Sequence, residues 1–169
     1  MHRNKKIIIL SHCILNQNSV VHPLARAKGG YTAIVEKIMN AEIGIVQLPC
    51  PELLHLGEDR PPKTKAEYDT PQFRQLCKKL LQLPMKQIQE YNRQGYKIIG
   101  ILGINESPTC SLLEERGILM EEFEIALQEE NLTLPILGIP TDYLEGEAHQ
   151  TFFEQLDDFL QNQQKEPSK

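Results

Sequence analysis

The 169-residue chain has no tryptophan, few aromatic residues (6%) and no long apolar run. Its first apolar stretch, Ile7–Leu10, is far shorter than the roughly 20 residues of a membrane span, and it is also too short for the apolar part of a secretory signal. We therefore expect a cytoplasmic protein that is not a membrane protein. The length favours one domain over residues 1–169, with residues 163–169 frayed.

Clustered positive charge is also missing. Lys and Arg number 18 against 23 Asp and Glu, which gives a net charge of −5, and no block of basic residues occurs. Domains that bind nucleic acids carry a basic patch or stripe. We therefore expect no nucleic-acid polymer as a partner.

Short β-branched runs alternate with helical patterns along the whole chain. This alternation predicts an α/β fold, in which helices flank a mostly parallel sheet with Rossmann- or flavodoxin-like layering. Ligands bind such folds beyond the carboxyl ends of the strands. The predicted strands are Ile7–Leu10, Ile43–Leu48, Lys97–Ile104 and Leu134–Ile139.

Between the strands, the spacing of apolar residues predicts helices over residues 72–94, 120–129 and 147–161. Because proline removes a backbone donor, we expect the first of these to break near Leu83-Pro84. Residues 56–71 are rich in proline, glycine and charge, and they predict a long loop.

Three of the four cysteines follow predicted strands. Cys13 follows the first strand, Cys50 the second, and Cys110 lies in the exit loop of the third. Neighbouring strands are about 4.8 Å apart, so three strand ends span roughly 10 Å. We expect these three thiols at one edge of the sheet, whereas Cys77 lies on the apolar stripe of a helix and is expected in the core.

Three thiolates without a fourth protein ligand suit a soft metal centre with one open position. A structural zinc site needs four ligands, commonly with local Cys pairs two to four residues apart, and the chain has no such pair. A cubane iron–sulfur cluster held by three cysteines leaves one iron open. The residues alone leave three alternatives: a cluster, a three-cysteine zinc site with a bound water, and buried structural cysteines.

An ordered set of motifs accompanies these cysteines. Together they resemble the DUF523, or 2-thiouracil desulfurase (TudS), family, and within it a divergent branch of TudS-related desulfidases. The similarity runs from about Lys6 to Ser111. After Cys13 the chain departs from the family pattern, so the resemblance leaves the natural substrate open. The matching segments are Ile8–Leu15, Cys50-Pro51-Glu52, the reduced Arg-Pro loop Leu56–Pro62, and Ser107-Pro108-Thr109-Cys110.

The resemblance implies that Cys13, Cys50 and Cys110 hold a [4Fe-4S] cluster with one open iron site. It also implies a non-redox reaction that removes sulfur from a small thiolated compound such as a thionucleobase. In the reaction that the resemblance implies, the thiocarbonyl sulfur would bind the open iron, the oxygen of water would replace the sulfur at carbon, and sulfide would be released. In this scheme Glu52 is the acid/base residue, and Ser107 hydrogen-bonds substrate or sulfide.

The sequence offers two further candidates for substrate binding. The amide of Asn16, beside Cys13, can read the donor and acceptor edge of a heterocycle, and Arg60 can clamp an anionic group. The alternatives are an ordinary turn for Asn16 and a solvated surface side chain for Arg60.

Glu52 and Ser107 also have non-catalytic alternatives, a solvated loop acid and a Ser-Pro turn. Two other functions compete for the chain as a whole. One is a non-catalytic flavodoxin-like binding domain with structural cysteines. The other is a zinc-dependent hydrolase that uses the same three cysteines, with Glu52 as base.

Overall fold

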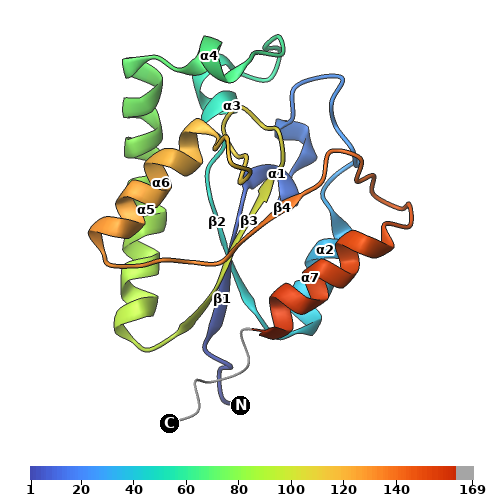
Figure 1. Ribbon diagram of the computed structural model, residues 1–169, viewed down its shortest axis with the longest axis vertical. Helices are drawn as coiled ribbons and strands as arrows, with labels where there is room; N and C mark the ends of the chain where they lie inside the picture. Colours follow the sequence, from blue (N-terminus) through green and yellow to red (C-terminus); the bar gives the residue numbers. More distant parts are fainter. Residues whose placement is uncertain (163–169) are drawn as a thin grey trace.

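Four parallel strands form one sheet in the order β2-β1-β3-β4 (Figure 1). The computed structural model describes residues 1–162, so the predicted frayed tail, residues 163–169, lies outside the described residues. The strands pair in parallel throughout, which confirms the predicted α/β class. They are β1 (Lys6–Leu10), β2 (Gly44–Gln47), β3 (Lys97–Ile104) and β4 (Ile136–Ile139).

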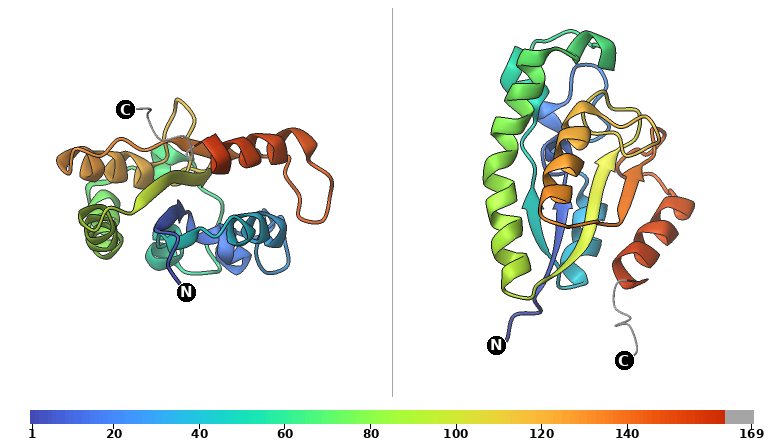
Figure 2. Two further views of the ribbon diagram at one scale, coloured as in Figure 1. Left: turned by 90° about the horizontal axis from the view of Figure 1, so that it is seen from below. Right: turned by 60° about the vertical axis from the view of Figure 1, so that its left-hand side comes forward.

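Helices cover both faces of the sheet, as the buried strands require. On one side lie α5 (Pro71–Arg93) and α6 (Ile118–Glu129), and on the other α2 (Thr32–Asn40) and α7 (Gln150–Asn162) (Figure 2). Side chains alternate along β1 because the strand period is two. Ile7 and Ile9 therefore pack with α5 and α6, whereas Ile8 and Leu10 pack with α2 and α7.

The direction of the crossovers reverses between the two central strands. The chain leaves β1 towards β2, whereas it leaves β3 towards β4 on the other side. Loops that diverge in this way open a crevice at the carboxyl ends of the strands. Four short segments lie beyond that edge: α1 (His12–Leu15), the 3₁₀ turn η1 (Gln17–Ser19), α3 (Pro51–Leu56) and α4 (Lys65–Tyr68).

The predicted break in the long helix is wrong. The structure has one continuous 23-residue helix, α5, with Pro84 inside it. Proline costs the helix one hydrogen bond, but Pro84 is buried, and Leu81, Met85 and Ile88 on both sides of it pack into the same apolar cluster. This packing holds the two halves in one line.

The prediction of a loop over residues 56–71 is partly wrong, because α4 lies within it. Thr64 caps this helix, accepting the backbone N–H of Glu67 at 3.3 Å, and the Glu67 carboxylate accepts the Thr64 N–H in return at 2.7 Å. This capping box satisfies two backbone donors that a short helix otherwise leaves free.

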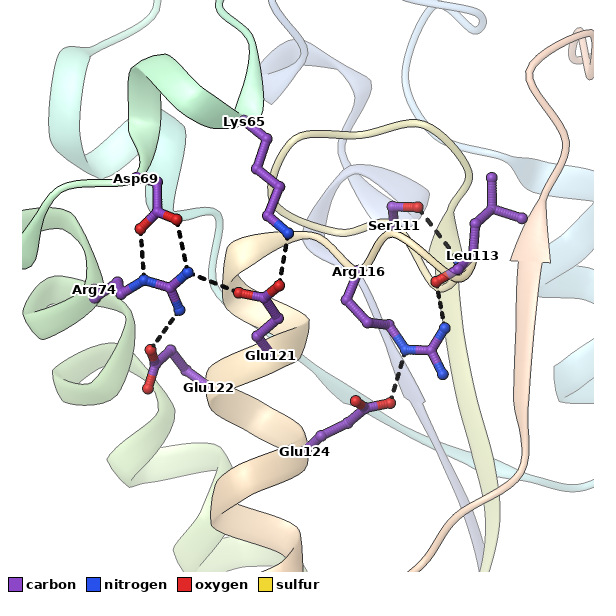
Figure 3. Close-up of polar contacts among 9 residues, drawn as sticks. All are labelled: Lys65, Asp69, Arg74, Ser111, Leu113, Arg116, Glu121, Glu122 and Glu124. Carbon is purple, nitrogen blue, oxygen red and sulfur yellow. Dashed lines mark hydrogen bonds and ion pairs between the residues drawn. The ribbon is translucent and has the colours of Figure 1, made fainter.

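An ionic network fixes α4 and the loop after β3 on the long helices (Figure 3). Arg74 bonds Asp69 at 2.6 Å, Glu121 at 2.8 Å and Glu122 at 2.9 Å, and Lys65 reaches Glu121 at 2.6 Å. In the same view, Arg116 bonds Glu124 at 2.9 Å and the backbone carbonyl of Leu113. These contacts place α4 and the loop on the carboxyl edge of the sheet.

Every helix within residues 1–162 is too short or too polar to span a membrane.

Candidate functional site

A cavity of about 370 Å³ lies at the carboxyl edge of the sheet. Its lining comes from the segments that follow all four strands, including Thr141 after β4. Cys13, Cys50 and Cys110 all line it. The structure thus brings together three thiols that are 37 and 60 residues apart in the chain, in a space whose size suits a small molecule.

The three thiols affect one another electrostatically. Burial raises the pKa of Cys13 well above its usual value, and the neighbouring Cys110 and Cys50 raise it further. Burial, followed by the proximity of Cys50, raises the pKa of Cys110 to about 12. Burial also raises the pKa of Cys50. As free cysteines, all three therefore hold their protons at neutral pH.

Local backbone contacts position each cysteine. Cys50 is the N-cap of α3, where its Sγ accepts the N–H of Leu53 at 3.5 Å. Cys13 lies in α1, and its carbonyl accepts the side-chain amide of Gln17 at 2.8 Å. Cys110 is joined to the end of β3, because its carbonyl accepts the N–H of Ile104 at 3.1 Å.

Ser107 lines the cavity, and it also organises the loop that carries Cys110. Its Oγ accepts the backbone N–H of Cys110 at 3.0 Å and that of Thr109 at 3.3 Å. Both bonds use the acceptor side of the hydroxyl. Because Thr109 donates its own proton to Glu52, the Ser107 proton is donated to Thr109 Oγ1 at 3.5 Å, a long contact. The Ser-Pro turn that the sequence offered as an alternative is thus present, and it lies in the site.

Two glycines that sequence reasoning missed make room for the Cys110 loop. A Cβ on Gly117 would collide with the peptide that joins Thr109 to Cys110, and one on Gly103 would lie 2.6 Å from the carbonyl oxygen of Cys110. Hydrogen bonds attach the loop to the start of α6, where the N–H of Ile118 donates to the carbonyl of Pro108 at 3.0 Å. Nothing in the sequence pattern marks such close approaches.

Glu52 lines the cavity with its carboxylate held on both sides. Thr109 donates its hydroxyl to Oε1 at 2.7 Å, and Tyr68 donates to Oε2 at 3.3 Å. Burial and the negative Glu52 raise the pKa of Tyr68 to about 12, so the phenol remains a donor. Because the Glu52 side chain is only 12% exposed, its alternative as a solvated loop acid is wrong.

Arg60 also lines the cavity, but the protein itself uses its donors. Its side chain is 2% exposed, and its Nε lies 3.4 Å from Glu52. Nη1 donates to the carbonyl of Gly57 at 2.9 Å, and Nη2 to that of Ser19 at 2.7 Å. The alternative of a solvated surface arginine is wrong, because three of the five N–H groups of Arg60 bond to Glu52, Gly57 and Ser19 and join α3 to η1. Its role in substrate binding stays a prediction.

Asn16 lies beside the site without lining the cavity. Its Oδ1 accepts the backbone N–H of Asn18 at 3.2 Å, which caps η1. The neighbouring Gln17 lines the cavity instead, with both ends of its amide bonded to the protein. Asn16 thus takes the turn role that the sequence offered as the alternative.

Sequence reasoning also missed Thr109, Tyr68 and Arg26. Thr109 was visible within the Ser107–Cys110 motif, between two residues chosen as candidates. Tyr68 and Arg26 carry no local signal, because long-range folding brings them to the carboxyl edge.

Three cysteines that form no disulfide line this one cavity, and soft thiolates are the ligands that iron–sulfur clusters use. Among residues 1–162, no group of three His, Cys, Asp or Glu side chains is arranged to hold a metal ion.

Fold and site together define an α/β protein with a three-thiol cavity at the switch point of a parallel sheet. The chain is 49% identical over 138 residues to the "uncharacterized protein MJ0003" of Methanocaldococcus jannaschii. The match covers 82% of this chain and 88% of that protein, so the chain belongs to the same family as MJ0003. No model of a known protein family matches the chain, and no solved structure does.

Proposed function

We propose that this protein is an iron–sulfur-dependent desulfidase, which removes sulfur from a small thiocarbonyl compound without redox chemistry and releases sulfide. The observation that supports the proposal most is the gathering of Cys13, Cys50 and Cys110 around one cavity with Glu52. The motif resemblance to the TudS family adds the reaction type.

In this proposal, Cys13, Cys50 and Cys110 hold a [4Fe-4S] cluster and leave one iron without a protein ligand. When bound, the cluster supplies a Lewis acid for the sulfur of the substrate. Metal binding requires deprotonated thiols. Loading would therefore release protons that burial keeps on all three cysteines and that neighbouring cysteines help to keep on Cys13 and Cys110.

Glu52 acts as the base in the proposed reaction. Its carboxylate takes one proton from water, the water oxygen bonds to the thiocarbonyl carbon, and the carbon–sulfur bond breaks. The carboxylate returns this proton to the departing sulfur, and the second proton moves from the new hydroxyl to the sulfur as the carbonyl forms. Thiocarbonyl plus water thus gives carbonyl plus hydrogen sulfide with no change in oxidation state. Thr109 and Tyr68 hold the two carboxylate oxygens in place for this proton transfer.

The rest of the lining supports a small ring as substrate. Val20, Val21 and Leu24 line the cavity beside the thiols. Apolar side chains of this kind exclude water from the reacting atoms and pack against a planar heterocycle. In this proposal, the Ser107 hydroxyl exchanges its long 3.5 Å contact with Thr109 for a hydrogen bond to substrate or sulfide.

Anaerobic purification with reconstitution tests the proposal. We expect a brown protein with equal amounts of iron and acid-labile sulfide, which releases sulfide from 2-thiouracil or a related thioamide. A colourless, iron-free protein after reconstitution contradicts the cluster. Zinc without sulfide, together with hydrolytic activity, would establish the zinc hydrolase instead.

A further inference from the structure

Arg26 lines the same cavity as the three thiols, from the loop between η1 and α2. Its Nη1 donates to the carbonyl of Pro140 at 2.6 Å, and its guanidinium carbon lies 5.9 Å from the ring centroid of Tyr31. One N–H group of the planar guanidinium is hydrogen-bonded and one face of the plane lies against Tyr31, so the guanidinium is oriented before any ligand binds.

The backbone of Arg26 is fixed on both sides. Its N–H donates to the Gln17 side chain at 2.8 Å, and its carbonyl accepts the N–H of Glu145 at 3.0 Å. Gln17 in turn bonds the carbonyl of Cys13. The loop of Arg26 and the loop after β4 therefore lie side by side (Figure 1). A rigid chain of contacts thus joins Arg26 to the turn that carries a thiol.

Arg26 forms no ion pair within the described residues. Among residues 1–162, no carboxylate oxygen lies within 4.0 Å of its guanidinium. Arg60, the other arginine of the cavity, is paired with Glu52. Three other acids lie in this region. Glu106 also lines the cavity, and the exposed Asp142 has its pKa lowered by His149 and to a lesser extent by Arg26. The Glu145 carboxylate accepts the N–H of Ala33 and the hydroxyl of Tyr143.

We infer that Arg26 binds an anionic substituent, a carboxylate or a phosphate, on a ligand whose reacting group faces the thiols. The guanidinium fork matches the geometry of both anions, and a charge-assisted bond in a half-buried site is strong. An uncharged base would leave this oriented cation without a partner. For the thiocarbonyl part of the ligand, the inference rests on the proposed function; for the anion it does not.

The test measures binding of unreactive oxygen analogues to the reconstituted protein by calorimetry. The probes are uracil (neutral), orotate (a carboxylate) and uridine monophosphate (a phosphate). We expect at least one anion to bind about tenfold or more tightly than uracil, and Arg26→Gln to remove that preference while leaving any affinity for uracil unchanged. Arg26→Lys retains part of the preference, and the exposed control Arg93→Gln retains all of it.

Preference for orotate identifies a carboxylate, and preference for uridine monophosphate a phosphate. The inference is overturned if neither anion binds better than uracil, or if Arg26→Gln weakens neutral and anionic ligands equally. Arg26-dependent anion binding in a protein that releases no sulfide leaves the inference standing and removes the proposed function. Sulfide release from neutral thiouracil, with no preference for anions, supports the proposed function and overturns the inference about Arg26.

Discussion

Two glutamates in this protein, the partly buried Glu52 and the buried Glu122, each lie beside an arginine and a cysteine but face different surroundings. Glu52 at the sheet edge pairs with Arg60 and lies two residues from Cys50. Glu122 on α6 pairs with Arg74. Burial raises the pKa of the nearby Cys77, and the Glu122 carboxylate raises it further. Both regions thus contain a glutamate, an arginine and a cysteine.

The difference lies in what those groups face. Arg74 binds three carboxylates, and Cys77 is fully buried in an apolar cluster, so this region joins helices (Figure 3). Glu52 instead faces a cavity that three thiols share. The comparison teaches that residue types do not make a site. The sheet edge makes one here, because the segments after the strands bring Glu52 and the three thiols to a shared cavity.

The largest effect is expected at Glu52. Because Glu52→Gln removes the proposed base, kcat/KM for sulfide release should fall about 10²- to 10⁴-fold while iron content is retained. Glu122→Gln is the matched control; it should lower stability and leave the rate per folded molecule unchanged. An undiminished rate in Glu52→Gln would remove Glu52 from the mechanism.

The next effect is expected in the helix network. Arg74→Met leaves the Glu122 side chain, which is 4% exposed, with Lys78 at 3.6 Å as its remaining cationic partner. A buried carboxylate deprived of its main partner destabilises a fold, and the partial exposure of Arg74 reduces the cost to roughly 2–3 kcal/mol. Urea unfolding measures it. If Arg74→Met lost iron without losing stability, the helix network would belong to the metal site and not to the structural support of the fold.

A smaller effect is expected at Gly117. Gly117→Ala forces a methyl group against the Thr109–Cys110 peptide, and overpacking of this kind costs roughly 1–3 kcal/mol. Iron binding should weaken as well, because the peptide carries a thiol. Gly29→Ala is the control, since open space surrounds that position. Equal results for the two variants would show that the Cys110 loop tolerates displacement.

The smallest effect is expected at a surface ion pair far from both regions. Lys37 lies 2.8 Å from Asp157, joining α2 to α7, with side chains 36% and 44% exposed. Solvent screens such pairs, so Asp157→Asn should cost less than about 1 kcal/mol in urea unfolding, and less still at high salt. A larger or salt-insensitive loss would mean that the pair stabilises the fold more than a solvated contact can.

The strands and the thiol set could be predicted from the sequence because they follow local rules. Lys97–Ile104 was predicted with the bounds that the structure gives, and β-branched runs marked the other strands. The parallel topology then placed Cys13, Cys50 and Cys110 at one edge. That these cysteines hold a metal stays a prediction.

Other features depended on tertiary packing or on a cue that was not used. Pro84 predicted a break because the sequence does not show that both flanking turns share one core. The capping pattern of Thr64 and Glu67 was readable, yet the surrounding proline and glycine concealed it. Which arginine forms an ion pair depends on distant partners, so the sequence did not show that Arg60 pairs with Glu52 or that Arg26 lines the same cavity.

Iron and acid-labile sulfide in four cysteine variants, each purified and reconstituted anaerobically, test the central claim most directly. We expect Cys13→Ala, Cys50→Ala and Cys110→Ala each to lose most of both, while Cys77→Ala, a buried cysteine outside the cavity, keeps them. If all four variants behave alike, whether they keep the metal, lose it or never bind it, the assignment of a metal centre to the sheet edge is wrong.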